Sequence, residues 1–384
     1  MSEQAAWRDA FSTYARYASW SMKGTPEEIA KIMKAKRINR WILQSAAREL
    51  LPLERVAKCL RVRIPIKNRD IAEHGRDSLE CWVEVWKSDK RKRAFYGNLA
   101  QCASVWHDPV CASKITEGKR VELSDTLDGC QYYQLMVTRT FQHSNKDHLP
   151  ELRKDFAEAK REVKAGRSWY LFKDDFGIVG SISGTEVNYS LENGFHLHDH
   201  NLYFFRDPVD PDEFRSAMLK RYSNAMEKRG RYVSGIYGLD VRATNDSVAD
   251  YVSKWGVDSE LAKYPTKQGQ DGHYSAFQLL QLYTEGVSWA GPVFREYART
   301  MKGTKQLVWS RHLRKILGAG REKTDPEHVE AFEEDAVHFA WLSLAQWRII
   351  LRHDKRGELL EVAALGSYAD LVTYLRTLGI FLES

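Results

Sequence analysis

Residues 194–205 read GFHLHDHNLYFF, and this stretch decides how the surrounding chain is interpreted. Its aromatic and apolar residues, preceded by a turn, are typical of a β-strand. In a strand, side chains at positions i and i+2 lie on one face, so His196, His198 and His200 are expected on the same side of a sheet. Imidazoles grouped in this way suit a divalent cation. The alternative interpretation is a set of histidines with a purely structural role.

A carboxylate is expected beside these histidines. Residues 180–189 also have a strand pattern, and Asn193-Gly194 has the composition of a hairpin turn. Antiparallel pairing across this turn would bring Glu186 within reach of the same cation. Two imidazoles and one carboxylate leave coordination positions open, which suits Mg²⁺ or Mn²⁺ acting on a phosphate as a Lewis acid. Zn²⁺ is a competitor, because nothing in this ligand set excludes it.

The surrounding chain predicts an α+β fold, with a central antiparallel β-sheet and packed helices, flanked by helical N- and C-terminal regions. Residues 1–60 and 327–384 have helical patterns, while residues 60–111 predict short strands and basic loops. The elements expected in the middle of the chain are strands at 134–141, 180–189, 195–205 and 238–242, and helices at 149–164, at 211–229 and from about 246.

Residues 246–256 contain a second candidate group. If this segment is helical, Tyr251 and Lys254 lie three residues apart on the same face. A phenol that is deprotonated near a cation can attack a phosphodiester and hold the strand as a phosphotyrosine. Lys254 would then stabilise the phenolate or the pentacoordinate phosphate. A tyrosine packed in the core is the alternative.

The composition is that of a globular protein and excludes wholesale disorder, with 43% hydrophobic and 29% charged residues among 384. The net charge of +6 is concentrated in residues 1–100, which contain 21 Lys and Arg against 12 Asp and Glu. This surplus suits a polyanionic partner, or else a solvated helix face. Without an apolar stretch of about 20 residues or a secretory signal, the sequence predicts a cytoplasmic protein with no membrane partner. An odd count of five cysteines favours thiols or a metal site over disulfides.

The His-x-His strand, the upstream Glu186 and the downstream Tyr-x-x-Lys together resemble the HUH endonucleases, specifically the single-tyrosine replication initiators of rolling-circle plasmids. The similarity preserves the order of the family blocks over about residues 50–320. Further segments that resemble family blocks are residues 51–59, 102–111, 185–189, 258–261 and 309–314.

The resemblance implies roles for individual residues in a nuclease domain with a ferredoxin- or RRM-like sheet. Tyr251 would be the nucleophile, with Lys254 as an auxiliary. The Mg²⁺ or Mn²⁺ ligands would be Glu186, His198 and His200, with His196 as the alternative imidazole. Two residues depart from the family pattern: Asp199 stands where the family usually has an apolar side chain, and Ser247 stands where it often has a glutamate thought to activate water at termination.

The implied activity is that of a DNA nickase and strand transferase. It would cut single-stranded origin DNA through a 5′-phosphotyrosine intermediate and rejoin the strand at termination. The implied partners are plasmid origin DNA, single-stranded and duplex, and the host helicase and replication machinery, because the sequence has no Walker-type phosphate-binding motif. The same chemistry would serve a transposase or a relaxase. A zinc-dependent hydrolase without a covalent DNA intermediate is the alternative from another class.

A structural Zn²⁺ site is also implied. Cys59, Cys102 and Cys111 match the likely zinc ligands of the family, and Asp108 stands at the remaining cysteine position. Because zinc prefers Cys and His, the adjacent His107 is the expected fourth ligand. Three buried thiols without a metal are the alternative.

Four regions follow from these patterns. They are a helical N-terminal region at residues 1–60, a basic, cysteine-containing DNA-binding region with the candidate zinc site at 61–130, a HUH endonuclease domain at 131–320, and a helical C-terminal region at 321–384.

Overall fold

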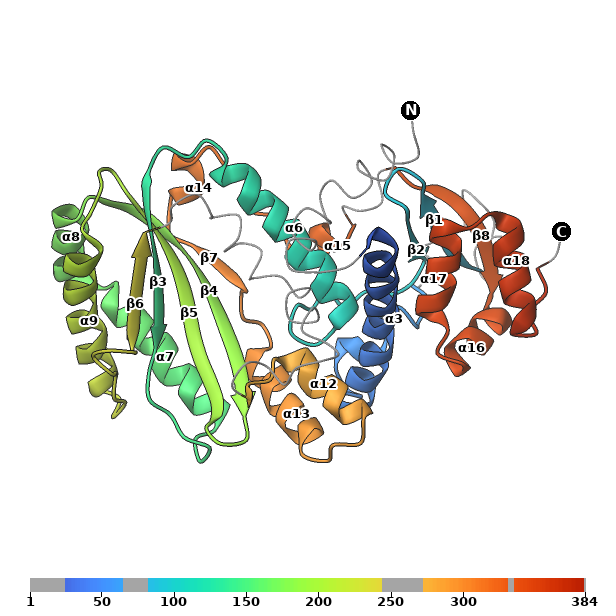
Figure 1. Ribbon diagram of the computed structural model, residues 1–384, viewed down its shortest axis with the longest axis horizontal. Coiled ribbons are helices and arrows are strands. Elements are labelled where there is room, and N and C mark those ends of the chain that lie inside the picture. The colour runs from blue at the N-terminus through green and yellow to red at the C-terminus, as the bar shows by residue number, and fades with distance from the viewer. Residues whose placement is uncertain (1–24, 65–81, 244–271, 331–334, 383–384) are drawn as a thin grey trace. The chain divides into compact units, whose positions relative to one another are not determined.

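The computed structural model describes residues 25–64, 82–243, 272–330 and 335–382. The chain divides into two compact units, one formed by Met1–Gly118 with Thr324–Ser384 (unit 1) and the other by Lys119–Lys323 (unit 2). The predicted α+β fold is confirmed, with an antiparallel sheet in each unit and helices packed around it (Figure 1). None of the helices in the described ranges is long and apolar enough to cross a membrane. The division into four regions stays a prediction.

Unit 2 is built on a five-stranded antiparallel sheet with the order β6-β3-β5-β4-β7. Its strands are β3 (Tyr133–Thr140), β4 (Ile178–Ser190), β5 (Gly194–Phe205), β6 (Leu239–Ala243) and β7 (Leu307–Trp309). The strands β4 and β5 form the long hairpin that the sequence predicts, and they lie side by side near the centre of the sheet (Figure 1). The three-residue strand β7 was not expected.

Helices pack on both faces of this sheet. Helix α7 buries Leu149, Leu152, Phe156, Ala159 and Val163, whose spacing of three and four residues forms one apolar stripe. This helix packs against β5 and against α9, which in turn packs against β6. On the other face, Leu123 of α6 and Leu313 of α14 pack in one cluster with Ile182, Leu202 and Phe204. The helices that complete the unit are α6 (Pro109–Leu127, which continues from unit 1), α7 (Leu149–Val163), α8 (Gly166–Asp175), α9 (Pro211–Glu227), α12 (Ala276–Thr284), α13 (Ala290–Met301) and α14 (Leu313–Ile316).

Unit 1 combines both ends of the chain. Helix α3 (Pro26–Leu50) begins with a capping box, in which Thr25 and Glu28 each bond the other's backbone N–H. The sheet has the order β2-β1-β8. The remaining elements are the 3₁₀ turn η1 (Arg55–Ala57), strands β1 (Trp82–Ser88), β2 (Arg93–Gly97) and β8 (Val337–Ser343), and helices α15 (Asp325–Glu330), α16 (Leu344–Arg352), α17 (Arg356–Leu365) and α18 (Tyr368–Thr377).

The C-terminal region differs from the sequence prediction in one element. The pattern of residues 327–384 predicts helices only, yet Val337–Ser343 forms strand β8. This strand pairs antiparallel with β1, which lies some 250 residues earlier in the chain. A local pattern does not contain that partner, so the strand could not be distinguished from a short helix by periodicity alone.

Candidate functional site

The β4–β5 hairpin brings one carboxylate and two imidazoles together. Glu186 lies directly opposite His198 in the strand register, and His200 follows two residues later on the same face. The Glu186 Oε2 atom lies 2.9 Å from His198 Nε2 and 3.2 Å from His200 Nε2. One ligand atom from each of the three residues lies within 4.8 Å of the other two. The predicted pairing across the hairpin is therefore present, and the three groups converge as the ligands of a single cation would.

The charge of Glu186 also suits a cation. Burial opposes ionisation of this carboxyl, but the hydrogen bonds from His198 and His200 and their electrostatic interaction with it hold its pKa well below its ordinary value. Glu186 is therefore an anion at neutral pH. An anionic oxygen beside two imidazole nitrogens is a donor set that Mg²⁺, Mn²⁺ or Zn²⁺ can use.

Two neighbouring side chains orient these groups. Thr138 on β3 lies opposite His200, and its Oγ1 is 2.9 Å from His200 Nδ1. If Nε2 of His200 faces a cation, Nδ1 carries the proton and donates it to this hydroxyl. On β4, the Asn188 amide donates a hydrogen bond of 3.2 Å to Glu186 Oε1, which leaves Oε2 to face the histidines. Thr138 leaves no signal in the sequence near the histidines, because it comes from another strand, whereas Asn188 is two residues from Glu186 and the alternation along β4 could have indicated it.

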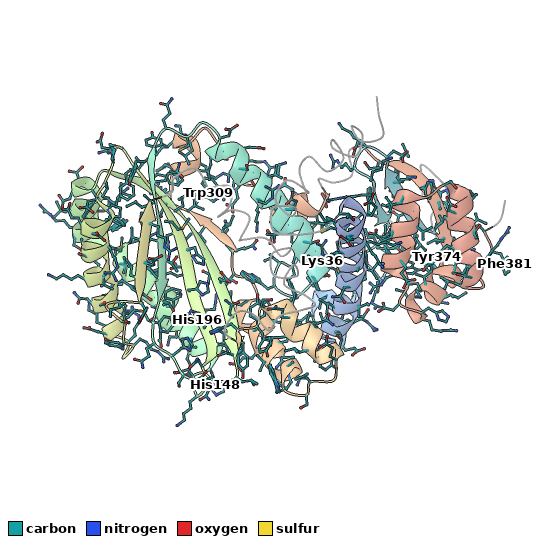
Figure 2. The ribbon with its side chains drawn as sticks, in the orientation of Figure 1. Lys36, His148, His196, Trp309, Tyr374 and Phe381 are labelled. Atoms are coloured by element: carbon teal, nitrogen blue, oxygen red, sulfur yellow. The ribbon has the colours of Figure 1, made fainter. Side chains whose placement is uncertain are left out.

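His196 lies on the same face but makes a different contact. Its Nδ1 is 2.7 Å from His143 Nε2, and His143 Nδ1 is 2.9 Å from the Asn193 carbonyl oxygen. Because a carbonyl only accepts, neutral His143 carries its proton on Nδ1, and His196 Nδ1 is the donor between the two rings. Burial and the neighbouring imidazoles of His198 and His143 lower the pKa of His196 to about 3. Figure 2 shows His196 on this sheet, and it is not part of the group formed by the other two histidines and Glu186.

Asp199 points to the opposite face of the sheet, where it is fully buried. Its two carboxylate oxygens accept hydrogen bonds of 3.0 and 2.7 Å from Arg139, and Lys160 Nζ lies 3.5 Å away. Burial opposes ionisation, but the Arg139 and Lys160 charges hold the pKa of Asp199 well below its ordinary value. The departure from an apolar residue at this position is thus compensated by a buried ion pair.

The structure does not describe the predicted nucleophile. Tyr251 and Lys254 lie in residues 244–271, outside the described residues, as does Ser247. Their roles stay predictions.

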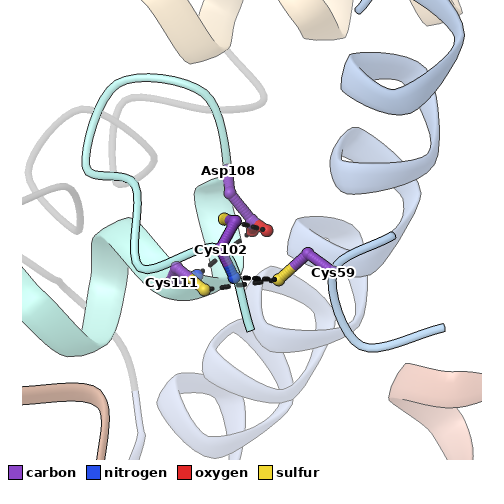
Figure 3. Close-up of side chains that lie close together, drawn as sticks. All are labelled: Cys59, Cys102, Asp108 and Cys111. Atoms are coloured by element: carbon purple, nitrogen blue, oxygen red, sulfur yellow. Dashed lines mark hydrogen bonds between the residues drawn. The ribbon is translucent and has the colours of Figure 1, made fainter. Parts of the chain in front are cut away.

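A second cluster lies in unit 1, where three thiols and one carboxylate converge (Figure 3). The sulfurs of Cys59 and Cys111 are 3.5 Å apart, and Cys102 Sγ is 3.2 Å from Asp108 Oδ2. A disulfide would place two sulfurs about 2.05 Å apart, whereas two ligands at about 2.3 Å from a tetrahedral Zn²⁺ lie roughly 3.8 Å apart. The observed separation of the Cys59 and Cys111 sulfurs is close to the metal-site value.

The fourth group of this cluster is the Asp108 carboxylate, where the sequence analysis expected the imidazole of His107. Asp108 immediately precedes α6, and its Oδ1 accepts hydrogen bonds from the backbone N–H groups of Val110 and Cys111 at 2.9 and 3.1 Å. This capping interaction holds the carboxylate at the start of the helix and turns Oδ2 toward the thiols. The Gln44 amide donates a further hydrogen bond of 2.8 Å to Oδ2.

The electrostatics of the cysteine cluster favour a single thiolate, at Cys111. All four side chains are buried. Hydrogen bonds from Cys102 and Cys59 lower the pKa of Cys111 well below its ordinary value. Hydrogen bonding to Cys111 and burial raise the pKa of Cys102 well above its ordinary value, and the same two effects outweigh the hydrogen bond with Cys102 and raise the pKa of Cys59. Burial and the charge of Cys111 raise the pKa of Asp108 to about 6. Zn²⁺ binds buried sulfur and oxygen donors of this kind in structural sites, and its charge would stabilise the thiolate form of the other two cysteines.

Comparison with known proteins identifies a distant relative. The chain is 22% identical over 308 residues to Protein rep of Streptomyces lividans, which covers 60% of this chain and 67% of that protein. No family model matches the chain. No solved structure matches it either. Together with the Glu186, His198 and His200 group, this homology confirms the resemblance drawn from the sequence.

Proposed function

We propose that this chain, a distant homologue of a plasmid replication initiator, starts rolling-circle replication by nicking single-stranded origin DNA and later rejoins the cut strand. The observation that supports this most directly is the convergence of Glu186, His198 and His200 on one point of the β4–β5 hairpin. A zinc-dependent hydrolase would use the same donors, but the homology with a replication protein favours DNA chemistry.

The three ligands would hold Mg²⁺ or Mn²⁺ through Glu186 Oε2 and the Nε2 atoms of His198 and His200. When bound, this cation supplies Lewis-acid polarisation of a phosphoryl oxygen. The side chains around the ligands orient them. Thr138 holds the ring orientation of His200, and Asn188 orients the Glu186 carboxylate, so that the donor atoms are in place before DNA binds.

Tyr251 is the proposed nucleophile, on the resemblance of its segment to the family. Its phenolate oxygen would attack the scissile phosphorus and form a new P–O bond, while the bond from phosphorus to the 3′-oxygen breaks. The 3′-oxygen takes up a proton and leaves as a hydroxyl that can prime synthesis. Lys254 would stabilise the phenolate by its charge. At termination a 3′-hydroxyl attacks the phosphotyrosine, which restores the phosphodiester and the free phenol.

The cysteine cluster is proposed to hold a structural Zn²⁺ through Cys59, Cys102, Asp108 and Cys111. The basic residues that precede β1 in the first hundred positions are proposed to bind duplex origin DNA by phosphate contacts. Unwinding of the duplex and synthesis would then depend on the host helicase and replication machinery.

The covalent intermediate provides the test. Single-stranded oligonucleotides labelled at the 3′ end are tiled across the replicon that encodes this chain and are incubated with protein and Mn²⁺. We expect a labelled protein–DNA adduct on denaturing gels, since the 3′ fragment stays on the tyrosine. Tyr251→Phe should abolish the adduct while DNA binding persists, because only the phenolic oxygen is removed.

Tyr170→Phe is the matched control, because Tyr170 is 73% exposed on α8 and lies outside the proposed site. An adduct that survives Tyr251→Phe would contradict the assignment. Cleavage without any adduct would instead support the metal-dependent hydrolase.

A further inference from the structure

The two faces of the three-stranded sheet in unit 1 differ in character. Helices α16 and α17 pack against this sheet (Figure 1). The strand residues directed to the helices are buried, namely the small or aliphatic Val83, Val85, Ala340 and Leu342 and the aromatic Tyr96. The opposite face has a group of aromatic side chains, which we call the aromatic face: Trp82, Trp86, Phe95, His338 and Trp341.

The rings of the aromatic face form a continuous surface over three strands. Trp86 lies opposite Phe95 on one side and His338 on the other in the strand register. The ring centroids of Trp86 and His338 are 5.5 Å apart, those of His338 and Trp341 are 4.1 Å apart, and those of Trp341 and Trp82 are 6.2 Å apart. The Glu84 carboxylate accepts a hydrogen bond of 2.7 Å from the Trp86 indole N–H and so fixes the orientation of that ring.

These rings are partly open to solvent. Trp341 is 45% exposed, and Trp82, Trp86, Phe95 and His338 are half-buried rather than buried. Aromatic residues contribute most to stability when they are fully buried, so several indoles placed together on an accessible sheet face indicate a binding surface.

The loop beside this surface is strongly basic. The β1–β2 turn has the sequence Asp89-Lys90-Arg91-Lys92, Arg93 follows as the first residue of β2, and Lys90 and Lys92 are exposed. Asp89 lies 3.3 Å from Lys87 and Asp335 lies 3.3 Å from Arg91, so each of these two acids pairs with another basic side chain. Trp86 lies two residues before Ser88, at which β1 ends. Phe95 lies two residues after Arg93, at which the paired strand β2 begins. Lys92 is three residues from Phe95 and Lys90 is four residues from Trp86, so at about 3.3 Å per residue these cations lie roughly 10–13 Å along the strands from the rings. Lys114 adds a further positive charge, 5.8 Å from the centre of the Phe95 ring.

A site for single-stranded nucleic acid combines two features: aromatic rings on which bases can stack, and nearby cations that can pair with phosphates. The aromatic face and the β1–β2 turn supply both. Duplex DNA does not fit as well, because its bases are stacked on each other and unavailable to a flat sheet face. A protein partner would use the rings but would gain little from the basic turn.

We propose that the aromatic face binds single-stranded DNA by base stacking, with Lys90 and Lys92 contacting the phosphates. The choice of DNA rests on the proposed function. This surface would bind the single strand exposed at the origin, and its residues differ from those proposed to cut that strand.

The test measures binding of a fluorescein-labelled oligo(dT) of about 15 nucleotides by anisotropy, without added Mg²⁺ or Mn²⁺ so that no cleavage occurs and without a chelator that would remove the proposed Zn²⁺. Trp341→Ala should weaken binding roughly tenfold, and Trp341→Phe should recover most of the affinity because it keeps a ring. Tyr368→Ala is the matched control, since Tyr368 is 47% exposed in the same unit but contacts Phe339 instead of the aromatic face. It should bind as the unchanged chain does. Lys90→Ala with Lys92→Ala should reduce the salt dependence of binding.

Failure of this proposal is distinguishable from failure of the nicking proposal. Tyr251→Phe should leave oligo(dT) binding unchanged, and Trp341→Ala should still form the covalent adduct at saturating DNA. The proposal would be overturned if Trp341→Ala bound oligo(dT) with wild-type affinity and had an unchanged melting temperature. It would also be overturned if the chain preferred duplex DNA over oligo(dT) and Trp341→Ala did not alter this preference. Loss of oligo(dT) affinity in Tyr368→Ala equal to that in Trp341→Ala would also overturn it.

Discussion

At the scale of single residues, the alternation of side chains along β5 places candidate metal ligands on one face of the sheet and a buried ion pair on the other. His198 and His200 face Glu186, while Asp199 between them enters the core and pairs with Arg139. A buried carboxylate is stable only when its charge is compensated, and the two hydrogen bonds from Arg139 provide that compensation. The ion pair therefore keeps Asp199 away from the proposed cation, so the two imidazoles are the ligands that β5 offers to that cation.

Thr138→Val tests how the site is oriented. The substitution keeps the side-chain volume but removes the hydroxyl that is hydrogen-bonded to His200 Nδ1, so the imidazole loses the contact that fixes its orientation. We expect Mn²⁺ affinity, measured by calorimetric titration, to fall by roughly 10-fold. Thr140→Val is the control on the same strand, because its hydroxyl bonds only the Leu197 carbonyl oxygen. Equal losses in both variants would show that strand stability, and not the contact to His200, determines metal affinity.

At the scale of elements, the β4–β5 hairpin depends on its turn. Gly194 has φ of +72°, a left-handed conformation that side chains disfavour. A Cβ atom there would lie 2.8 Å from Asn145 Cα and 3.0 Å from the Ser144 carbonyl oxygen, so the backbone of the neighbouring loop also requires glycine. Since a one-residue change of register would turn every side chain of β5 to the other face, the turn determines whether Glu186 meets the histidines at all.

Gly194→Ala should therefore destabilise the fold beyond the ordinary cost of a left-handed alanine. Gly230→Ala is the matched control, because Gly230 has φ of +69° but no heavy atom of another residue within 4 Å of its Cβ position. We expect a loss of about 1 kcal/mol in Gly230→Ala and of about 2–4 kcal/mol in Gly194→Ala, measured by urea unfolding. Indistinguishable losses would mean that the loop at Ser144 and Asn145 moves aside at no cost.

At the scale of the whole molecule, unit 1 is assembled from distant parts of the chain. Strand β8 completes a sheet begun by β1, and α17 packs against α3. The cysteine cluster joins three further segments: Cys59 follows η1, Cys102 follows β2, and Cys111 lies in the first turn of α6. A metal ion held by these groups would connect segments whose closure is entropically costly.

Removal of zinc should therefore lower the stability of unit 1 more than that of unit 2. We expect about one Zn²⁺ per chain by elemental analysis, and a chelator should lower the temperature of the first unfolding transition. Cys111→Ser should have the same effect, whereas Cys130→Ser should not, since Cys130 is a free, half-buried thiol outside the cluster. A metal-free chain whose melting is unaffected by chelator would instead support three buried thiols without a metal.

The sequence by itself determined the α+β class, the β4–β5 hairpin and the meeting of Glu186 with His198. These features depend on local rules, because turn composition and the two-residue alternation of a strand act over a few positions. The resemblance to replication initiators has a different basis, since it depends on short segments that are similar to blocks of that family and occur in the same order.

Only the tertiary structure decided which partners lie across strands and helices. It selected Asp108 over His107 through the capping of α6, placed Thr138 against His200, and made a strand of residues 337–343 by pairing them with β1. The aromatic face also depends on that pairing, because β8 brings Trp341 to Trp82 and Trp86 from the other end of the chain. Contacts between residues far apart in sequence leave no local periodicity, so they become visible only when the chain is folded.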